Sequence, residues 1–125
     1  MARDVFVHWK SEAPSTQDVQ AALEDYTAGL GAQITWAQDR FMVTLPGVPS
    51  YPFQRVGPAT EAQRKAWVLS AREDDGSPRR RWFEVWLDDE SMDVITRDMD
   101  EITNAVAREF AVICARGWRG RLQEG

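Results

Sequence analysis

Nucleophilic catalysis has few candidate residues in this chain, which contains one cysteine, Cys114, and one histidine, His8. They form the only possible thiol–imidazole pair, and a serine hydrolase of the usual type would also need His8 as its base. Cys114 falls beside an apolar stripe with helical spacing, where a free cysteine behaves as a small hydrophobe. No Gly-x-Ser-x-Gly motif is present. These observations favour a non-enzymatic protein.

Acidic residues cluster around one turn of the chain, at Asp88, Asp89, Glu90 and Asp93. Hard cations bind converging oxygen ligands, but this spacing is not that of an EF-hand loop, and turns attract acids for other reasons. Histidine and cysteine are too few to hold a transition metal. Neither a Walker loop nor a G-x-G-x-x-G turn occurs. We therefore expect no metal site and no cofactor.

The most unusual feature is tryptophan, of which the chain has six. Two of them lie in the segment 82–88, which alternates as a β-strand does, with successive side chains on opposite faces. One face is apolar and carries Phe83, Val85 and Leu87. The other alternates indoles with acids and consists of Trp82, Glu84, Trp86 and Asp88. Exposed aromatic patches are typical of binding surfaces, so we expect these four residues to bind a protein partner or a second copy of the chain.

A second hypothesis concerns the segment 46–65, a proline-rich loop. Its prolines exclude a long helix or a central strand, and loops of this length are often functional. Closed as a lid, the loop would make the chain a small-ligand-binding protein or a minor enzyme, with a pocket lined by Trp36, Tyr51, Phe53 and Trp67. In the opposing interpretation the loop only packs its aromatic residues onto the core. It could also cover the tryptophan face, which would then be structural.

The charge of the chain narrows the class of partner. A formal net charge of −5 and a pI near 4.9 argue against nucleic acid, whose binding surfaces are basic and clustered. The one basic run, at 79–81, is interpreted as a solvated hairpin end. No apolar run approaches the roughly 20 residues that cross a bilayer, and charged residues interrupt any leader-like start. We therefore expect a cytoplasmic protein with a basic protein partner or a homodimer.

Alternation and capping signals predict the elements that must position these residues. The first helix begins at the N-cap Ser15 and ends at Gly31, and the second begins at Asp98 and ends at Gly117. Strands are predicted at 4–10, 34–36, 41–45, 66–72, 82–88 and 92–97. Turn residues at 74–78 predict that 66–72 pairs antiparallel with 82–88.

This order of elements predicts the fold class. A strand, a helix, several meandering strands and a final helix favour an α+β two-layer sandwich, in which an antiparallel sheet of about five to six strands carries both helices on one face. All 125 residues are expected to form a single globular domain, with a flexible tail at 119–125. The second face of the sheet would then be open, and Trp82 and Trp86 would lie on it.

Overall fold

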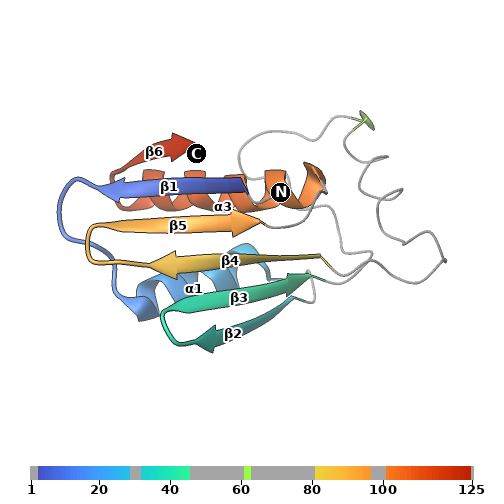
Figure 1. Ribbon diagram of the computed structural model, residues 1–125, viewed down its shortest axis with the longest axis horizontal. Coiled ribbons are helices and arrows are strands. Elements are labelled where there is room, and N and C mark those ends of the chain that lie inside the picture. Colours follow the sequence, from blue (N-terminus) through green and yellow to red (C-terminus); the bar gives the residue numbers. More distant parts are fainter. Residues whose placement is uncertain (1–2, 29–31, 46–60, 63–80, 97–100, 125) are drawn as a thin grey trace.

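The computed structural model describes residues 3–28, 32–45, 61–62, 81–96 and 101–124, and within them the chain forms one antiparallel sheet and two long helices (Figure 1). The strands follow the order β2-β3-β4-β5-β1-β6 across the sheet. In chain order the elements are β1 (Arg3–Trp9), α1 (Thr16–Tyr26), β2 (Gln33–Ala37), β3 (Arg40–Leu45), β4 (Arg81–Leu87), β5 (Ser91–Thr96), α3 (Glu101–Gly117) and β6 (Gly120–Glu124).

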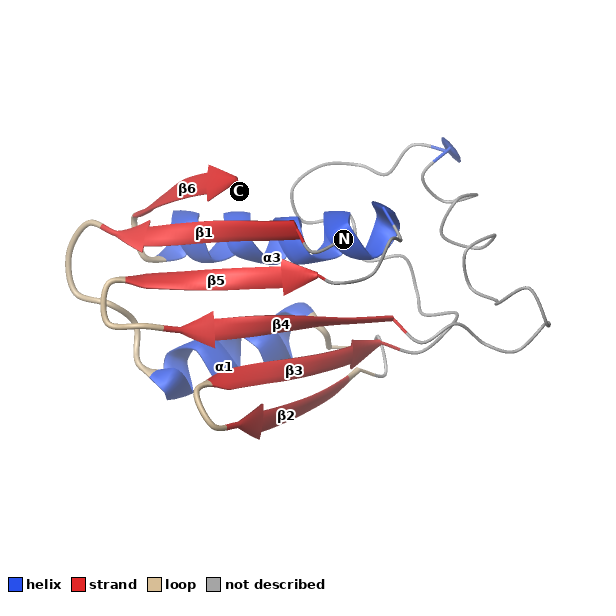
Figure 2. Ribbon diagram, viewed as in Figure 1, coloured by secondary structure: helices blue, strands red, loops and turns tan. Residues whose placement is uncertain are grey.

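Both helices pack on the same face of the sheet (Figure 2), which confirms the predicted α+β two-layer arrangement. The alternation of apolar residues along the strands points one set of side chains toward the helices. Those side chains and the apolar stripes of the helices form the core: Val5, Val7, Phe41, Val43, Leu45, Phe83, Val85, Met92 and Val94 from the sheet, and Val19, Leu23, Tyr26, Val106, Phe110 and Cys114 from the helices.

Helix α1 begins where the sequence predicts. Ser15 accepts a hydrogen bond from the backbone N–H of Asp18, whose side chain accepts one from the backbone N–H of Ser15, which is a capping box. The predicted end at Gly31 is wrong, because α1 ends at Tyr26 and Thr27 is its C-cap. The Thr27 hydroxyl donates to the carbonyl of the preceding turn, at 2.7 Å, and so satisfies a helix-end acceptor.

Two tight hairpins set the register of the central strands. β2 and β3 pair antiparallel around Gln38 and Asp39, and Gln38 adopts a φ of 61°. β4 and β5 are joined through 88–90, where the Asp88 N–H donates to the Ser91 carbonyl at 2.9 Å. Because the loops are short, side chains from these strands meet in fixed cross-strand pairs.

The predicted pairing of 66–72 with the tryptophan strand is wrong. β4 pairs with β3 on one side and with β5 on the other, so both of its edges are hydrogen-bonded. The segment 66–72 itself lies outside the described residues, as does most of the loop at 46–65. The turn residues at 74–78 also lie outside the described residues, and β3 and β4, which pair directly, are separated by residues 46–80 in the chain.

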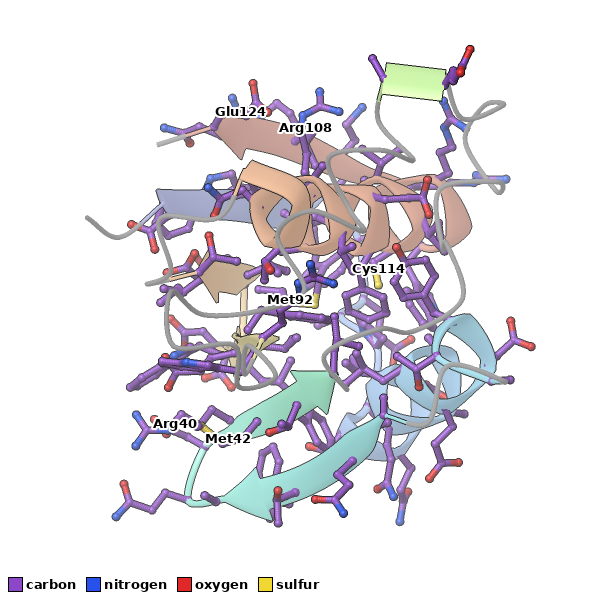
Figure 3. The ribbon with its side chains drawn as sticks, turned by 90° about the vertical axis from the view of Figure 1, so that its right-hand side faces the viewer. Arg40, Met42, Met92, Arg108, Cys114 and Glu124 are labelled. Atoms are coloured by element: carbon purple, nitrogen blue, oxygen red, sulfur yellow. The ribbon has the colours of Figure 1, made fainter. Side chains whose placement is uncertain are left out.

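The sequence predicts a flexible tail at 119–125, but Gly120–Glu124 form the edge strand β6, which pairs antiparallel with β1. Arg119 reverses the chain with a φ of 53°. Gly120 then passes so close to β1 that an added Cβ would lie 2.4 Å from a methyl carbon of Val7. Glu124 forms an ion pair with Arg108 of α3 (Figure 3). The sequence does not predict this strand because its residues are mostly polar, and edge strands tolerate polar residues.

Polar contacts tie the two helices together beneath the sheet. The Tyr26 hydroxyl contacts the Val106 carbonyl at 3.2 Å and the Glu109 carboxylate at 2.9 Å.

Arg81, which the sequence places in a solvated basic run, is instead fully buried at the start of β4. Its position in the strand accounts for this difference, since Arg81 points to the same side as Phe83 and Val85.

Candidate interaction face

We define the open face as the side of the sheet opposite the helices, which is turned toward the viewer in Figure 1. The register places Trp82, Glu84 and Trp86 of β4 on this face, while Asp88 follows the end of the strand and is exposed. The rest of the face consists of Asp4, Phe6, His8, Gln33, Thr35, Ala37, Arg40, Met42, Thr44, Ser91, Asp93, Ile95, Arg121 and Gln123. The sequence thus predicts correctly which side of β4 faces away from the helices.

Arg40 covers one side of the Trp86 indole. Its guanidinium carbon lies 4.3 Å from the ring centroid, a cation–π contact, and its Nε lies 3.5 Å from a carboxylate oxygen of Glu84. Figure 3 shows Arg40 beside Met42 on the side away from the helices. The pairing of Arg40 with Trp86 across β3 and β4 brings these groups together. Sequence reasoning missed Arg40, because its partner depends on which strand lies beside β4.

Glu84 is the most buried acid of the open face, with 4% of its surface exposed. It lies between Met42 and Ile95 in the cross-strand row, so apolar neighbours shield it while Arg40 supplies the opposite charge. A carboxylate in this setting depends on its ion pair. Trp82 and Trp86 are half-buried, so the face is a packed surface that leaves part of each indole in contact with solvent.

A hollow of about 410 Å³ lies on the open face beside Trp86, and Arg40 is not among the residues that line it. Trp86 and Phe6 project from β4 and β1, and Asp93 of β5 lies between them, because these three residues are neighbours in one cross-strand row. The turns at the ends of the strands complete the rim of the hollow with Asp39, Leu87, Asp88 and Ser91. The hollow therefore combines aromatic side chains with three carboxyl groups.

Asp93 is the perturbed acid of this hollow. Burial is the largest cause that raises the pKa of its carboxyl, and the neighbouring Asp4 carboxyl adds to it through its negative charge and a shared hydrogen bond; together they raise the pKa from 3.8 to about 7. A carboxyl with a pKa near 7 changes charge close to neutral pH. Two buried polar atoms here, Asp93 Oδ1 and Trp86 Nε1, have no hydrogen-bond partner in the described part of the chain. Such atoms carry a free-energy cost in the folded protein.

Of the four residues predicted to line the alternative pocket, the structure describes only Trp36. Tyr51, Phe53 and Trp67 lie outside the described residues, so their convergence with Trp36 stays a prediction. Trp36 lies on the edge strand β2 on the helix side of the sheet, where it packs against Phe41 and is 46% exposed. It is therefore not part of the open face.

The two candidate nucleophilic partners lie on opposite sides of the sheet. His8 is on the open face, where its Nε2 lies 2.7 Å from the side-chain oxygen of Gln123. Cys114 is fully buried in the core, and burial raises the pKa of its thiol to about 12. The sheet thus separates them. No group of acids, histidines and cysteines that could hold a metal ion occurs among the residues that the structure covers.

None of the helices in the described ranges is long and apolar enough to cross a membrane. Comparison with known protein families, with curated proteins and with solved structures found no significant match to this chain.

Proposed function

We propose that this chain is a non-enzymatic protein-interaction domain that binds a basic protein partner through the open face of its sheet. The observation that carries the proposal is the position of Trp82 and Trp86, which are half-buried on the side that neither helix covers. Each exposed indole that a partner removes from water contributes roughly 25 cal/mol per Å² of apolar area. Tryptophan is also among the residue types enriched at the energetic centres of interfaces.

The charge of the face supports a basic partner. Around the two arginines of the face lie more carboxyl groups, from Asp4, Asp39, Glu84, Asp88 and Asp93. Complementary charge speeds encounter and selects against wrong partners. The same charges oppose a homodimer, because face-to-face contact between two copies would bring like charges together.

The test compares three forms of the chain as bait in a source-cell lysate: the wild type, Trp82→Ala/Trp86→Ala, and Trp36→Ala as the matched control. Trp36 is an exposed tryptophan on the other side of the sheet. Its substitution therefore also replaces an indole with a methyl group but leaves the open face unchanged. A protein retained by the wild type and by the control is then purified and titrated by calorimetry. We expect a net positive partner whose affinity falls at least about tenfold with the double substitution and about tenfold between low and high salt.

A second variant distinguishes loss of binding from loss of folding. Asp39→Asn/Asp88→Asn changes two exposed carboxylates at the rim of the hollow. The amide oxygen introduced at position 88 can still accept from the Asp89 N–H, as the Asp88 carboxylate does. This variant should fold as the wild type and bind the partner more weakly. A captured protein that binds all variants equally, or a salt-independent homodimer in sedimentation, would overturn the proposal.

A further inference from the structure

We propose that the hollow between Trp86 and Phe6 binds one arginine side chain of the partner, with Asp93 as the carboxylate that pairs with its guanidinium. This inference rests on the proposed function, since it names the group that the basic partner inserts. It assigns the indole of Trp86 two cationic neighbours, Arg40 of the same chain and an arginine of the partner.

The spacing of the strands suits a planar group. Trp86 and Phe6 project from β4 and β1, which flank β5, so their backbones are about 9–10 Å apart at ~4.8 Å per strand. After half the thickness of each facing ring, about 1.7 Å, is subtracted, a gap of roughly 6 Å remains, enough for one flat group in contact with a ring. Asp93 is shorter than the residues on either side, so its carboxyl lies at the floor of this gap.

The chain itself contains a guanidinium in an equivalent setting. Arg40 stacks on Trp86 at 4.3 Å and approaches the Glu84 carboxylate at 3.5 Å. The hollow also offers an aromatic ring with a carboxylate close to it, here Trp86 of β4 with Asp93 of the neighbouring strand β5. A guanidinium is planar and weakly hydrated, so it stacks and pairs at once, whereas a lysine ammonium is a compact and strongly hydrated charge.

Charge and hydrogen bonding favour a cation over a neutral ligand. Asp39 and Asp88 at the rim add negative potential to that of Asp93. Asp93 lines the hollow, and a guanidinium presents five N–H donors in a fork that matches a carboxylate. The hollow is open to solvent, whereas a drug-sized ligand is usually bound in a pocket that buries most of its surface.

The experiment titrates the complete chain with Nα-acetyl-arginine amide at pH 8 and follows ¹H–¹⁵N NMR spectra. The lysine and citrulline amides serve as comparison probes, because citrulline keeps the shape of arginine without its charge. We expect saturable shifts of the Trp86 indole N–H and of the Phe6 and Asp93 amides, with a Kd in the millimolar range. Arginine should bind at least about threefold more tightly than lysine and at least about tenfold more tightly than citrulline.

Asp93→Asn is the decisive variant, and Glu24→Gln is its control, because Glu24 is an exposed acid on α1 and its substitution changes the net charge equally. Asp93→Asn should weaken arginine binding at least about fivefold, and Glu24→Gln should leave it unchanged. Equal binding of arginine and citrulline, equal loss in both variants, or unsaturable shifts spread over the acidic surface would overturn the inference. If the partner still binds the open face through Trp82 and Trp86, the proposed function stands without the arginine site. If the partner does not bind the open face, both the proposed function and the arginine site are wrong.

Discussion

The substitution Asp93→Asn should make the free protein more stable at pH 8. Burial and Asp4 raise the pKa of Asp93 in the folded state from 3.8 to about 7, so between these values the folded chain binds more protons than the unfolded chain. The free energy of unfolding contributed by this group is therefore greatest below about pH 4 and is lost as the pH rises toward 7. Asparagine is neutral at every pH and can still donate to Asp4, as protonated Asp93 does.

The magnitude follows from the size of the shift. About three pKa units would be worth about 4 kcal/mol at 1.36 kcal/mol each, but Asp93 is only half-buried, and solvent screening reduces the value to about 1–2 kcal/mol. Asp4→Asn should remove only the smaller part of the pH dependence, since burial is the largest cause of the shift. The other charged groups around Asp93 on this face are Asp39, Arg40, Glu84 and Asp88.

Urea denaturation from pH 4.5 to 8.5, monitored by circular dichroism, measures this effect as the difference between wild type and Asp93→Asn. That difference cancels the titration of the remaining carboxyl groups. We expect the two proteins to be similar near pH 4.5 and Asp93→Asn to be more stable by about 1–2 kcal/mol at pH 8. Parallel stability curves, or a less stable variant at pH 8, would refute the assignment of a raised pKa to Asp93.

Three further predictions concern the fold that carries the face. Gly120→Ala should destabilise the protein by about 1–3 kcal/mol, because its Cβ would clash with Val7; calorimetry measures this, and an unchanged Tm would contradict it. Cys114 should react with a thiol reagent only as fast as the protein unfolds, since it is buried with a pKa of about 12; modification within minutes under native conditions would show an exposed thiol. Tyr26→Phe should cost about 1–2 kcal/mol in urea denaturation, because it removes the hydroxyl that contacts Val106 and Glu109; a loss below about 0.3 kcal/mol would mean that the contact is not stabilising.

Local patterns predicted the parts of the fold that depend on local physics. Strand alternation placed Trp82 and Trp86 opposite the apolar residues of β4, and the apolar stripe with helical spacing placed Cys114 in the core. The N-cap Ser15 fixed the start of α1. Each of these features depends on side chains a few residues apart, so a single segment contains the information.

The features that escaped prediction depend on strand order. Nothing in the segment 82–88 indicates that β5 and β1 follow it in the sheet, so the row of Arg40, Trp86, Asp93 and Phe6 could not be assembled. One signal was present: β1 alternates in the same manner, with Phe6 on the side opposite the apolar residues. The strand β6 could not be predicted, because Leu122 is its only apolar side chain. The need for glycine at position 120 becomes clear only from its close approach to β1 in the structure.

The hollow carries local costs that the fold does not require. A carboxyl group with its pKa raised to about 7 destabilises the folded chain at neutral pH, and a buried indole N–H without a partner in the described residues adds a desolvation cost. Neither Asp93 nor Trp86 packs against the helices, so a neutral side chain at position 93 would preserve the core. Local destabilisation of this kind is typical of sites that a ligand completes. Stability at pH 8 and arginine binding should therefore change in opposite directions in Asp93→Asn, and a purely structural role for Asp93 does not predict that combination.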